Sequence, residues 1–387
     1  MANNKSQIKR ILVLSDPPAS PGYLPRLRYL CDYLVRKGCE VSLLTEEYEP
    51  LPFAHSYPIE TIRMYRGGTF EWLCKAVWTL LTDWHNRVFA KRALSTMHGR
   101  FDIVLCTAFS DFPLGAAQRI AKQLNVPLLC DIRDLDEQVD NSQYQYHHKQ
   151  WWIMPFRRLY RAIHIRRRNK VLRTADAITT VSPWHAAFIQ AIRGQQSEVH
   201  IIYNGFDDKQ FYPEDIPSKQ FTITYIGSLH DWQKPALEKV QQAIEELNKS
   251  QIINHKFEII LDIHTPENRP VSYDRLGDAI RHSDMMLVLT SANTRGMLTT
   301  KFYEALGCAK PILCVPSDQG SLAELINYTN AGIATDDIEQ IKAFIRENYL
   351  SWQQNGFTRQ DVQHREQFTR EHQCKLMEQE IVKLLNR

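Results

Sequence analysis

Short apolar runs alternate along this chain with segments of helical periodicity. Residues 11–14 have the pattern of a buried strand, residues 24–35 carry Leu at helical spacing until Gly38, and residues 41–45 have the pattern of a second strand. A strand, a helix and a strand in this order form a βαβ unit with parallel strands. The loop over residues 15–22 is therefore expected at the carboxyl edge of the sheet, where ligands bind in such folds.

The same alternation continues through both halves of the chain. Further strand patterns lie at residues 102–106, 127–134, 177–181, 199–203, 221–228, 257–263, 285–290 and 332–334. This order predicts the α/β fold class, with two doubly wound domains. We expect the first domain over residues 1–213 and the second over 219–357, and a charged helix over about 358–387 that can return to the first domain. Residues 48–100 give no clear prediction.

The stretch over residues 299–315 predicts a ligand-binding element. Thr299 and Thr300 provide hydroxyls that cap a short helix, and an apolar strand follows that helix. The free N–H groups and the positive dipole end of such a helix favour an anion. Lys301 suits a phosphate, and the carboxylate of Glu304 suits the hydroxyl pair of a ribose. Together they indicate a nucleotide-sugar diphosphate; the alternative is a solvated Lys301 and a Glu304 that only complements its helix dipole.

Composition narrows the class of protein. The 387 residues include 47 basic and 44 acidic ones, a net charge of +3 that excludes a globally polyanion-binding protein. The eight cysteines form no C-x-x-C pair, so we expect reduced core residues without metal ligands or disulfides. No window approaches 18 uninterrupted apolar residues, and the N-terminus has no signal-like segment. We therefore expect a cytoplasmic protein.

Several motifs, taken together in their order, carry a family resemblance. They are the Pro-rich loop that ends in Pro21-Gly22, the segment Thr174 to Ser182, Ile202 to Phe206, Tyr225 to Ser228, and Lys301 to Val315 followed by Asp318 to Gly320. On these residues the chain resembles the retaining, family-4-like bacterial glycosyltransferases of the GT-B fold, in which two Rossmann-like domains face each other across a cleft. The resemblance covers most of the chain.

The resemblance implies a mechanism. The nucleotide sugar would bind the C-terminal domain and the acceptor the N-terminal domain, and the sugar would be transferred with retention of anomeric configuration. Basic residues and helix dipoles would neutralise the diphosphate, so no metal ion or other cofactor is expected. The implied partners are a nucleotide sugar and a glycan or lipid-linked acceptor in surface-polysaccharide synthesis.

The same resemblance assigns donor-binding residues. Glu304 matches the second glutamate of the family's two-glutamate motif, which holds the ribose, whereas the first glutamate falls at Gly296 and is missing. Ser228 stands where the family usually has arginine, and Lys234 stands near the basic residue that meets the diphosphate. The full expected donor set is Gly227, Ser228, Lys234, Thr299, Thr300, Lys301 and Glu304.

The candidate acceptor side lies in the first half of the chain. Residues 131–134 end a strand where many relatives carry an acceptor-side histidine and others carry Arg-Asp. The candidate catalytic residues are Asp134 or Asp131, which would orient the acceptor, and Arg133, which would contact the donor phosphate. The alternative is an Arg-Asp pair that only fixes the loop. The loop residues Pro21, Gly22 and Tyr23 complete the expected acceptor set.

A basic segment spans residues 151–173. It carries eight Lys and Arg residues and no acidic residue, with an opposite stripe of Trp152, Phe156, Leu159, Tyr160 and Ile163. Such a segment suits an anionic membrane surface, here the inner face of the membrane. The alternative is a helix packed on the core with a solvated basic face. No nucleic-acid-reading module is recognised, so nucleic acid is not an expected partner.

Two other functions compete with glycosyl transfer. A sugar-nucleotide 2-epimerase can have the same two-domain architecture and would use carboxylates and histidines for proton transfer. A non-catalytic nucleotide-sugar-binding protein would fit the missing glutamate, but it would leave Lys301, Glu304 and Lys234 around one pocket unexplained.

Overall fold

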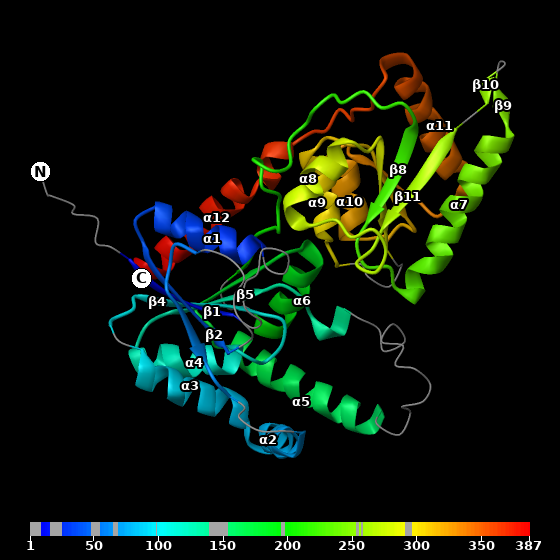
Figure 1. The fold of residues 1–387 in the computed structure, drawn as a ribbon. Helices are drawn as coiled ribbons and strands as arrows, with labels where there is room; N and C mark the ends of the chain where they lie inside the picture. The colour runs from blue at the N-terminus through cyan, green and yellow to red at the C-terminus, as the bar shows by residue number, and fades with distance from the viewer. Residues whose placement is uncertain are drawn as a thin grey trace, which may run out of the picture. The chain divides into compact units, whose positions relative to one another are not determined.

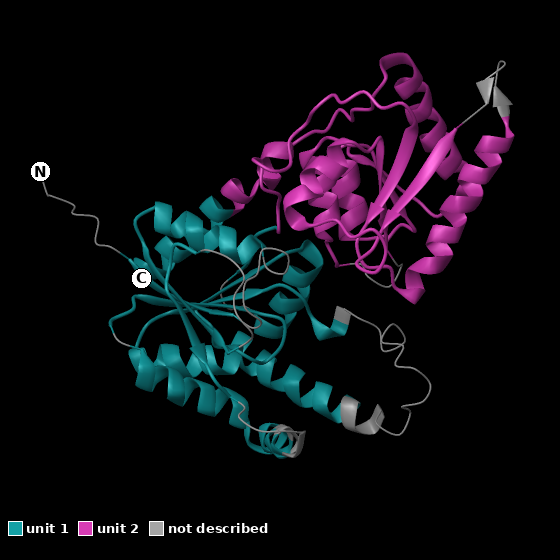
Figure 2. Ribbon diagram, viewed as in Figure 1, with its two compact units in different colours: residues 1–137, 144–203, 374–387 teal, residues 138–143, 204–373 magenta. Residues whose placement is uncertain are grey.

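The computed structural model describes residues 9–15, 25–47, 55–64, 69–97, 99–138, 154–194, 198–252, 255–256, 258–290 and 296–387. The chain forms two compact units, which Figure 2 shows in different colours. Unit 1 takes residues 1–137, 144–203 and 374–387, and unit 2 takes residues 138–143 and 204–373. Apart from residues 138–143, the chain passes from unit 1 to unit 2 after Tyr203 and returns after Gln373.

Unit 1 is built on a seven-stranded parallel sheet with the strand order β3-β2-β1-β4-β5-β6-β7. The strands are β1 (Arg10–Ser15), β2 (Glu40–Glu46), β3 (Ile59–Ile62), β4 (Ile103–Ala108), β5 (Leu128–Ile132), β6 (Ala177–Thr180) and β7 (Val199–Ile201). Strand β4 is buried along its whole length because helices cover both faces of the sheet, which explains its continuous apolar sequence. The predicted parallel α/β architecture is confirmed.

Helices cover the two faces of this sheet (Figure 1). One face packs on α1 (Pro25–Arg36) and α12 (Arg370–Leu385). The other packs on α3 (Trp84–Thr96), α4 (Leu114–Leu124), the end of α5 (Met154–Leu172) and α6 (Pro183–Arg193). The segment without a clear prediction contains β3, α2 (Thr69–Thr82) and α3.

Unit 2 has a five-stranded parallel sheet with the order β11-β8-β12-β13-β14. Its strands are β8 (Phe221–Ile226), β11 (Ile259–His264), β12 (Met285–Leu289), β13 (Ile312–Val315) and β14 (Gly332–Ala334), and a short antiparallel pair joins β9 (Gln251–Ile252) to β10 (His255–Lys256). Its helices are α7 (Lys234–Lys249), α8 (Tyr273–Arg281), α9 (Thr300–Gly307), α10 (Ser321–Tyr328) and α11 (Ile338–Asn355). The second predicted α/β unit is therefore present.

Helix α12 begins at Arg370, later than the expected residue 358. The preceding segment bonds to unit 2 instead, because the Gln360 N–H donates to the Ala309 carbonyl at 2.9 Å and the Gln363 N–H to the Thr329 carbonyl at 2.7 Å. N–H groups engaged in this way cannot make helical hydrogen bonds. In α12 itself, the buried apolar side chains that join the core of unit 1 are Cys374, Met377, Ile381 and Leu384.

Among the described helices, none combines the length and apolarity that a membrane crossing needs.

Candidate functional site

The N-terminus of α9 carries the predicted donor residues of unit 2. Thr299 is its N-cap, with the Thr299 side-chain oxygen accepting a hydrogen bond from the Lys301 N–H at 3.4 Å. The chain folds this way because a Thr hydroxyl satisfies one of the N–H groups that the first helical turn leaves without a partner. The helix ends at Gly307, where an added Cβ would lie 2.7 Å from the Phe206 ring and 2.8 Å from the Phe211 Cβ. Close packing therefore requires glycine at that end.

Lys301 lies against the loop that follows β8. A Cβ added to Gly227 would stand 2.4 Å from the Lys301 Cε and 2.7 Å from its Nζ, and the ammonium lies 5.5 Å from the centre of the Tyr225 ring. Gly227 has φ +137°, a conformation that favours glycine. Burial lowers the pKa of Lys301, and the charge of Glu304 opposes this shift. The structure thus brings Gly227 and Lys301, 74 positions apart in the numbering, into direct contact.

Glu304 is a buried carboxylate one helical turn after Lys301. Its side chain is only 6% exposed, and the Thr300 hydroxyl hydrogen-bonds to it. Burial raises the pKa of Glu304, while the charges of Arg370 and Lys301 act in the opposite direction. It costs free energy to leave the oxygens of a buried carboxylate without hydrogen-bond donors. A ligand that donates hydrogen bonds would therefore be favoured there.

The other predicted donor residues lie on the surface of unit 2. Ser228 is exposed, and its carbonyl accepts a hydrogen bond from the Tyr225 hydroxyl at 2.6 Å. Lys234 begins α7, is exposed, and pairs with Asp231 at 2.7 Å. Gly296 lies in a turn before α9 and, as glycine, offers no carboxylate.

Asp131, at the end of β5, is a fully engaged carboxylate in unit 1. It receives two hydrogen bonds from the Arg26 guanidinium, at 3.0 and 3.1 Å, and one each from the hydroxyls of Thr107 at 3.2 Å and Thr179 at 2.7 Å. These bonds join α1, β4, β5 and β6. Asp131 therefore anchors the first turn of α1 at the carboxyl edge of the sheet.

Arg133 and Asp134 follow β5 at the same edge. The Arg133 guanidinium lies 5.3 Å from the centre of the Phe109 ring, a cation–π contact. Burial raises the pKa of Asp134, and the charge of Arg133 opposes this shift. The carboxylate of Asp131 is bound to Arg26, whereas Asp134 is not among the groups that bind Arg26. Asp134 is therefore the better candidate of the two for orienting the acceptor substrate. Pro21, Gly22 and Tyr23 lie outside the described residues.

Sequence reasoning missed Arg370, the first residue of α12. It is 3% exposed, and its Nη1 donates to the Tyr273 hydroxyl at 2.9 Å. Arg370 is also the cation that contributes most to lowering the pKa of Glu304. No local motif identifies Arg370, because it follows Glu304 in the sequence only after two strands and two helices.

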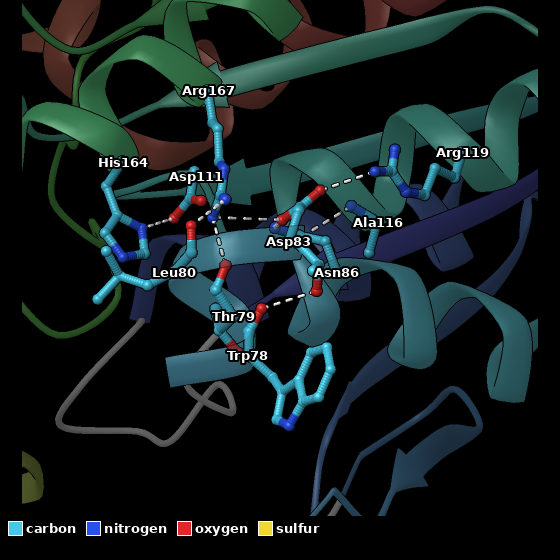
Figure 3. A network of polar contacts seen from close by, with 11 residues as sticks. Trp78, Thr79, Leu80, Asp83, Asn86, Asp111, Ala116, Arg119, His164 and Arg167 are labelled. Atoms are coloured by element: carbon cyan, nitrogen blue, oxygen red, sulfur yellow. Dashed lines mark hydrogen bonds and ion pairs between the residues drawn. The ribbon is translucent and has the colours of Figure 1, made fainter. Parts of the chain in front are cut away.

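Helix α5 covers residues 154–172 of the predicted basic segment, and residues 151–153 lie outside the described part of the chain. Some of its charges point inward: Arg168 is buried and pairs with Glu137 at 2.5 Å, and Arg167 donates to the carbonyls of Thr79 and Leu80, each at 2.7 Å. Figure 3 shows Arg167 at the end of α2. Helix α5 is therefore held against α2 by charged hydrogen bonds.

A polar network around Asp83 extends this connection (Figure 3). The Asp83 carboxylate accepts from Arg119 at 2.7 Å and from Asn86 at 2.8 Å, and Asn86 in turn accepts from the Ala116 N–H at 2.9 Å. His164 of α5 hydrogen-bonds to the buried Asp111 after β4. Polar groups of α3, α4 and α5 thus meet beside the end of α2, which fixes these helices relative to one another.

Comparison with known families assigns the first part of the chain. Residues 26–210 match the sequence model of Glycosyltransferase Family 4. No curated protein matches the sequence significantly.

Comparison with solved structures identifies the fold of nearly the whole chain. Sucrose-phosphate synthase from Thermosynechococcus elongatus is similar with a TM-score of 0.66 and 16% identity, over 98% of this chain and 99% of that one. HepE from Anabaena, in complex with UDP and glucose, has a TM-score of 0.61 and 14% identity over 97% and 100%. A 2-epimerase from Listeria monocytogenes, described as a UDP-N-acetylglucosamine 2-epimerase, has a TM-score of 0.52 and 11% identity over 97% and 96%.

These similarities agree on the GT-B architecture, which an epimerase shares. Residues 26–210, just under half of the chain, match the glycosyltransferase family 4 model, and nearly the whole chain has the fold of these structures.

Proposed function

We propose that this enzyme binds the diphosphate of its nucleotide sugar at the N-terminus of α9 and transfers the sugar, with retention, to a glycan or lipid-linked acceptor in surface-polysaccharide synthesis. The observation that carries the proposal is the contact of the Lys301 side chain with Gly227. A glycine loop lets a phosphate approach the backbone, and an ammonium beside it supplies positive charge. Gly227, Ser228, Lys234, Thr299 and Thr300 would complete the phosphate side of this site.

The chemistry requires charge neutralisation at the leaving diphosphate. As the bond between the sugar and the phosphate breaks, negative charge grows on the phosphate oxygens, and Lys301 with the helix N–H groups would stabilise it. Glu304, one turn further along α9, would accept hydrogen bonds from the ribose hydroxyls. The UDP and glucose in the HepE complex make UDP-glucose the first donor to test.

A thermal-shift series with UDP, GDP, ADP and their glucose conjugates tests the donor, because a ligand that binds only the folded protein raises its melting temperature. We expect one nucleotide diphosphate to stabilise the enzyme above the others. Conversion of a nucleotide sugar to an epimer in the absence of acceptor would contradict glycosyl transfer and support the 2-epimerase alternative.

We expect Asp134→Asn to reduce turnover by about 10²-fold, the usual effect of a misoriented reactant, and to leave UDP affinity unchanged. The reason is that Asp134 lies in unit 1, where it would orient the acceptor, whereas the donor residues lie in unit 2. UDP release from UDP-glucose with a lipid-linked glycan preparation measures turnover, and calorimetry measures affinity. Asp102→Asn, an exposed aspartate before β4, is the matched control. Unchanged turnover in Asp134→Asn would refute the assignment.

Helices α2 and α5 support a peripheral membrane location at the inner face. The exposed basic residues in and directly after α5 are Arg158, Arg166, Lys170 and Arg173. At about 100° per residue they fall on one face of the helix. On α2, Val77, Trp78 and Leu81 are 50%, 57% and 74% exposed. Apolar side chains beside a basic helix face match the interface of an anionic bilayer.

We expect wild-type protein to sediment with vesicles of phosphatidylcholine and phosphatidylglycerol and to remain in solution with phosphatidylcholine alone. Arg166→Glu with Lys170→Glu should abolish sedimentation, because both exchanges place negative charge against the anionic surface. Trp78→Ser with Leu81→Ser should weaken it, and Leu350→Ser, an exposed apolar residue of unit 2, should not. Equal sedimentation of all variants would remove the membrane proposal and leave the donor site untouched.

A further inference from the structure

One face of helix α5 bonds to the loops that follow β4 and β5, two neighbouring strands of the sheet in unit 1. Arg161, His164 and Arg168 recur at intervals of three and four residues, so they lie on the same face of the helix. His164 hydrogen-bonds to Asp111 after β4, as Figure 3 shows, and Arg161 donates to the Asp136 carbonyl after β5. This face of α5 therefore contacts the carboxyl edge of the sheet.

Arg168 makes a bidentate ion pair with Glu137, after β5. Its Nη1 and Nη2 donate to the two carboxylate oxygens of Glu137 at 2.8 and 2.5 Å, while its Nε and Nη2 donate to the Asn169 side-chain oxygen at 3.1 and 2.8 Å. Arg168 is 0% exposed, and the side chain of Glu137 is 22% exposed. Two parallel bonds from a planar guanidinium fix both the distance and the orientation of a carboxylate. Arg168 therefore fixes where Glu137 lies.

Glu137 belongs to the segment that carries the candidate acceptor residues. At the start of this segment, the Arg133 N–H still bonds to a carbonyl of β4 at 3.3 Å. Leu135 is 1% exposed and packs in the apolar core, and Glu137 lies in the single 3-10 turn that follows. Asp134 stands three residues before Glu137. The backbone that carries Asp134 is therefore held by the sheet on one side and by α5 on the other.

We propose that Arg168 is a positioning residue of the acceptor side, which acts through Glu137 to fix residues 133–137 and with them the Asp134 carboxylate. The inference rests on the proposed role of Asp134 in orienting the acceptor, and it adds a buried arginine that does not itself touch the substrate. The basic segment then contributes to the acceptor site by its buried face, whereas its exposed face carries the charges proposed for the membrane.

Glu137→Asp separates positioning from charge. The substitution keeps the carboxylate but shortens its side chain by one methylene group, so the ion pair with Arg168 persists only if the segment moves toward α5. Misplacement of a reactant by about 1 Å lowers a rate by up to about 10²-fold. We therefore expect kcat to fall by about 10- to 10²-fold. The KM for UDP-glucose should change little, because the expected donor residues lie in unit 2.

The experiment measures UDP release from UDP-glucose by the full-length enzyme with a lipid-linked glycan preparation, at a temperature where thermal unfolding shows every variant to be folded. Glu40→Asp is the matched control, because Glu40 is an exposed glutamate at the start of β2 that pairs with Arg10 at 2.9 Å. It should keep the wild-type kcat. Arg168→Lys keeps the charge but loses the bidentate geometry, so its kcat should fall as well. If Arg168→Lys does not fold, Glu137→Asp still decides: a wild-type kcat in that variant would overturn the inference.

A double-mutant cycle with Asp134→Asn shows whether Glu137 acts through Asp134. If it does, Glu137→Asp should have little further effect on kcat in the Asp134→Asn enzyme, because the group that it misplaces is already altered. An equal fold-reduction in both backgrounds would overturn the role of Arg168 and leave the role of Asp134 intact. Wild-type turnover in Asp134→Asn alone would contradict the acceptor assignment, and the role of Arg168 with it. Absence of sugar transfer by the wild-type enzyme from any nucleotide sugar would contradict the proposed function itself.

Discussion

Glu304→Ala is expected to weaken UDP binding by roughly 1–3 kcal/mol, the contribution of charge-assisted hydrogen bonds to a ligand. The carboxylate is buried and bonded to Thr300, and burial raises its pKa, so its ionised form carries a desolvation cost. The substitution removes the acceptor for the ribose hydroxyls. Calorimetry with UDP measures the loss directly.

Glu324→Ala is the matched control for that measurement. Glu324 is an exposed carboxylate in the first turn of α10, in the same unit. We expect its removal to leave UDP affinity unchanged. If Glu304→Ala and Lys301→Ala both bound UDP as tightly as the wild type, the donor could not lie at α9.

Lys301→Ala is expected to lower turnover by roughly 10²- to 10³-fold, the cost of removing one group that stabilises charge in the transition state. The end of the Lys301 side chain occupies the space that a Cβ at position 227 would need, and its ammonium lies over the Tyr225 ring. The ammonium is therefore in place before the substrate binds. Its charge matters most when the diphosphate departs, so kcat should fall more than UDP affinity does.

Release of UDP from UDP-glucose measures this effect. Lys249→Ala, an exposed lysine at the end of α7 that pairs with Glu245, is the control. Lys234 is the other basic residue expected at the diphosphate. The kcat of Lys234→Ala, compared with that of Lys301→Ala, shows how much each lysine contributes to neutralising the diphosphate. Wild-type kcat in Lys301→Ala would mean that another group neutralises the leaving diphosphate.

Most of the fold could be predicted because its strands are buried on both faces. Strands such as β4 and β13 are continuous apolar runs, which sequence periodicity detects easily. The region containing β3 and α2 gave no pattern for the opposite reason. Helix α2 is apolar on an exposed side, at Val77, Trp78 and Leu81, so it lacks the usual division between a buried apolar face and a polar one.

The candidate site was predictable only where its determinants are local. The cap at Thr299 and the residues Lys301 and Glu304 lie within one short segment, and a helix start has a recognisable sequence. The hydrogen bonds of the Asp131 carboxylate come from Arg26 and from hydroxyls on two other strands. These partners lie far from Asp131 in the sequence, so no local pattern predicts them. Arg370 was missed for the same reason, since only the fold brings it to the Tyr273 hydroxyl.

The place of α12 in unit 1 has a consequence for biosynthesis. Met377, Ile381 and Leu384 complete the apolar core against α1 and the first-made strands, and they are translated only after the whole of unit 2. Unit 1 therefore keeps an uncovered sheet face while unit 2 is being synthesised. A nonsense mutation shortly after Gln373 would consequently damage the fold of unit 1 more than that of unit 2, whose residues end at Gln373.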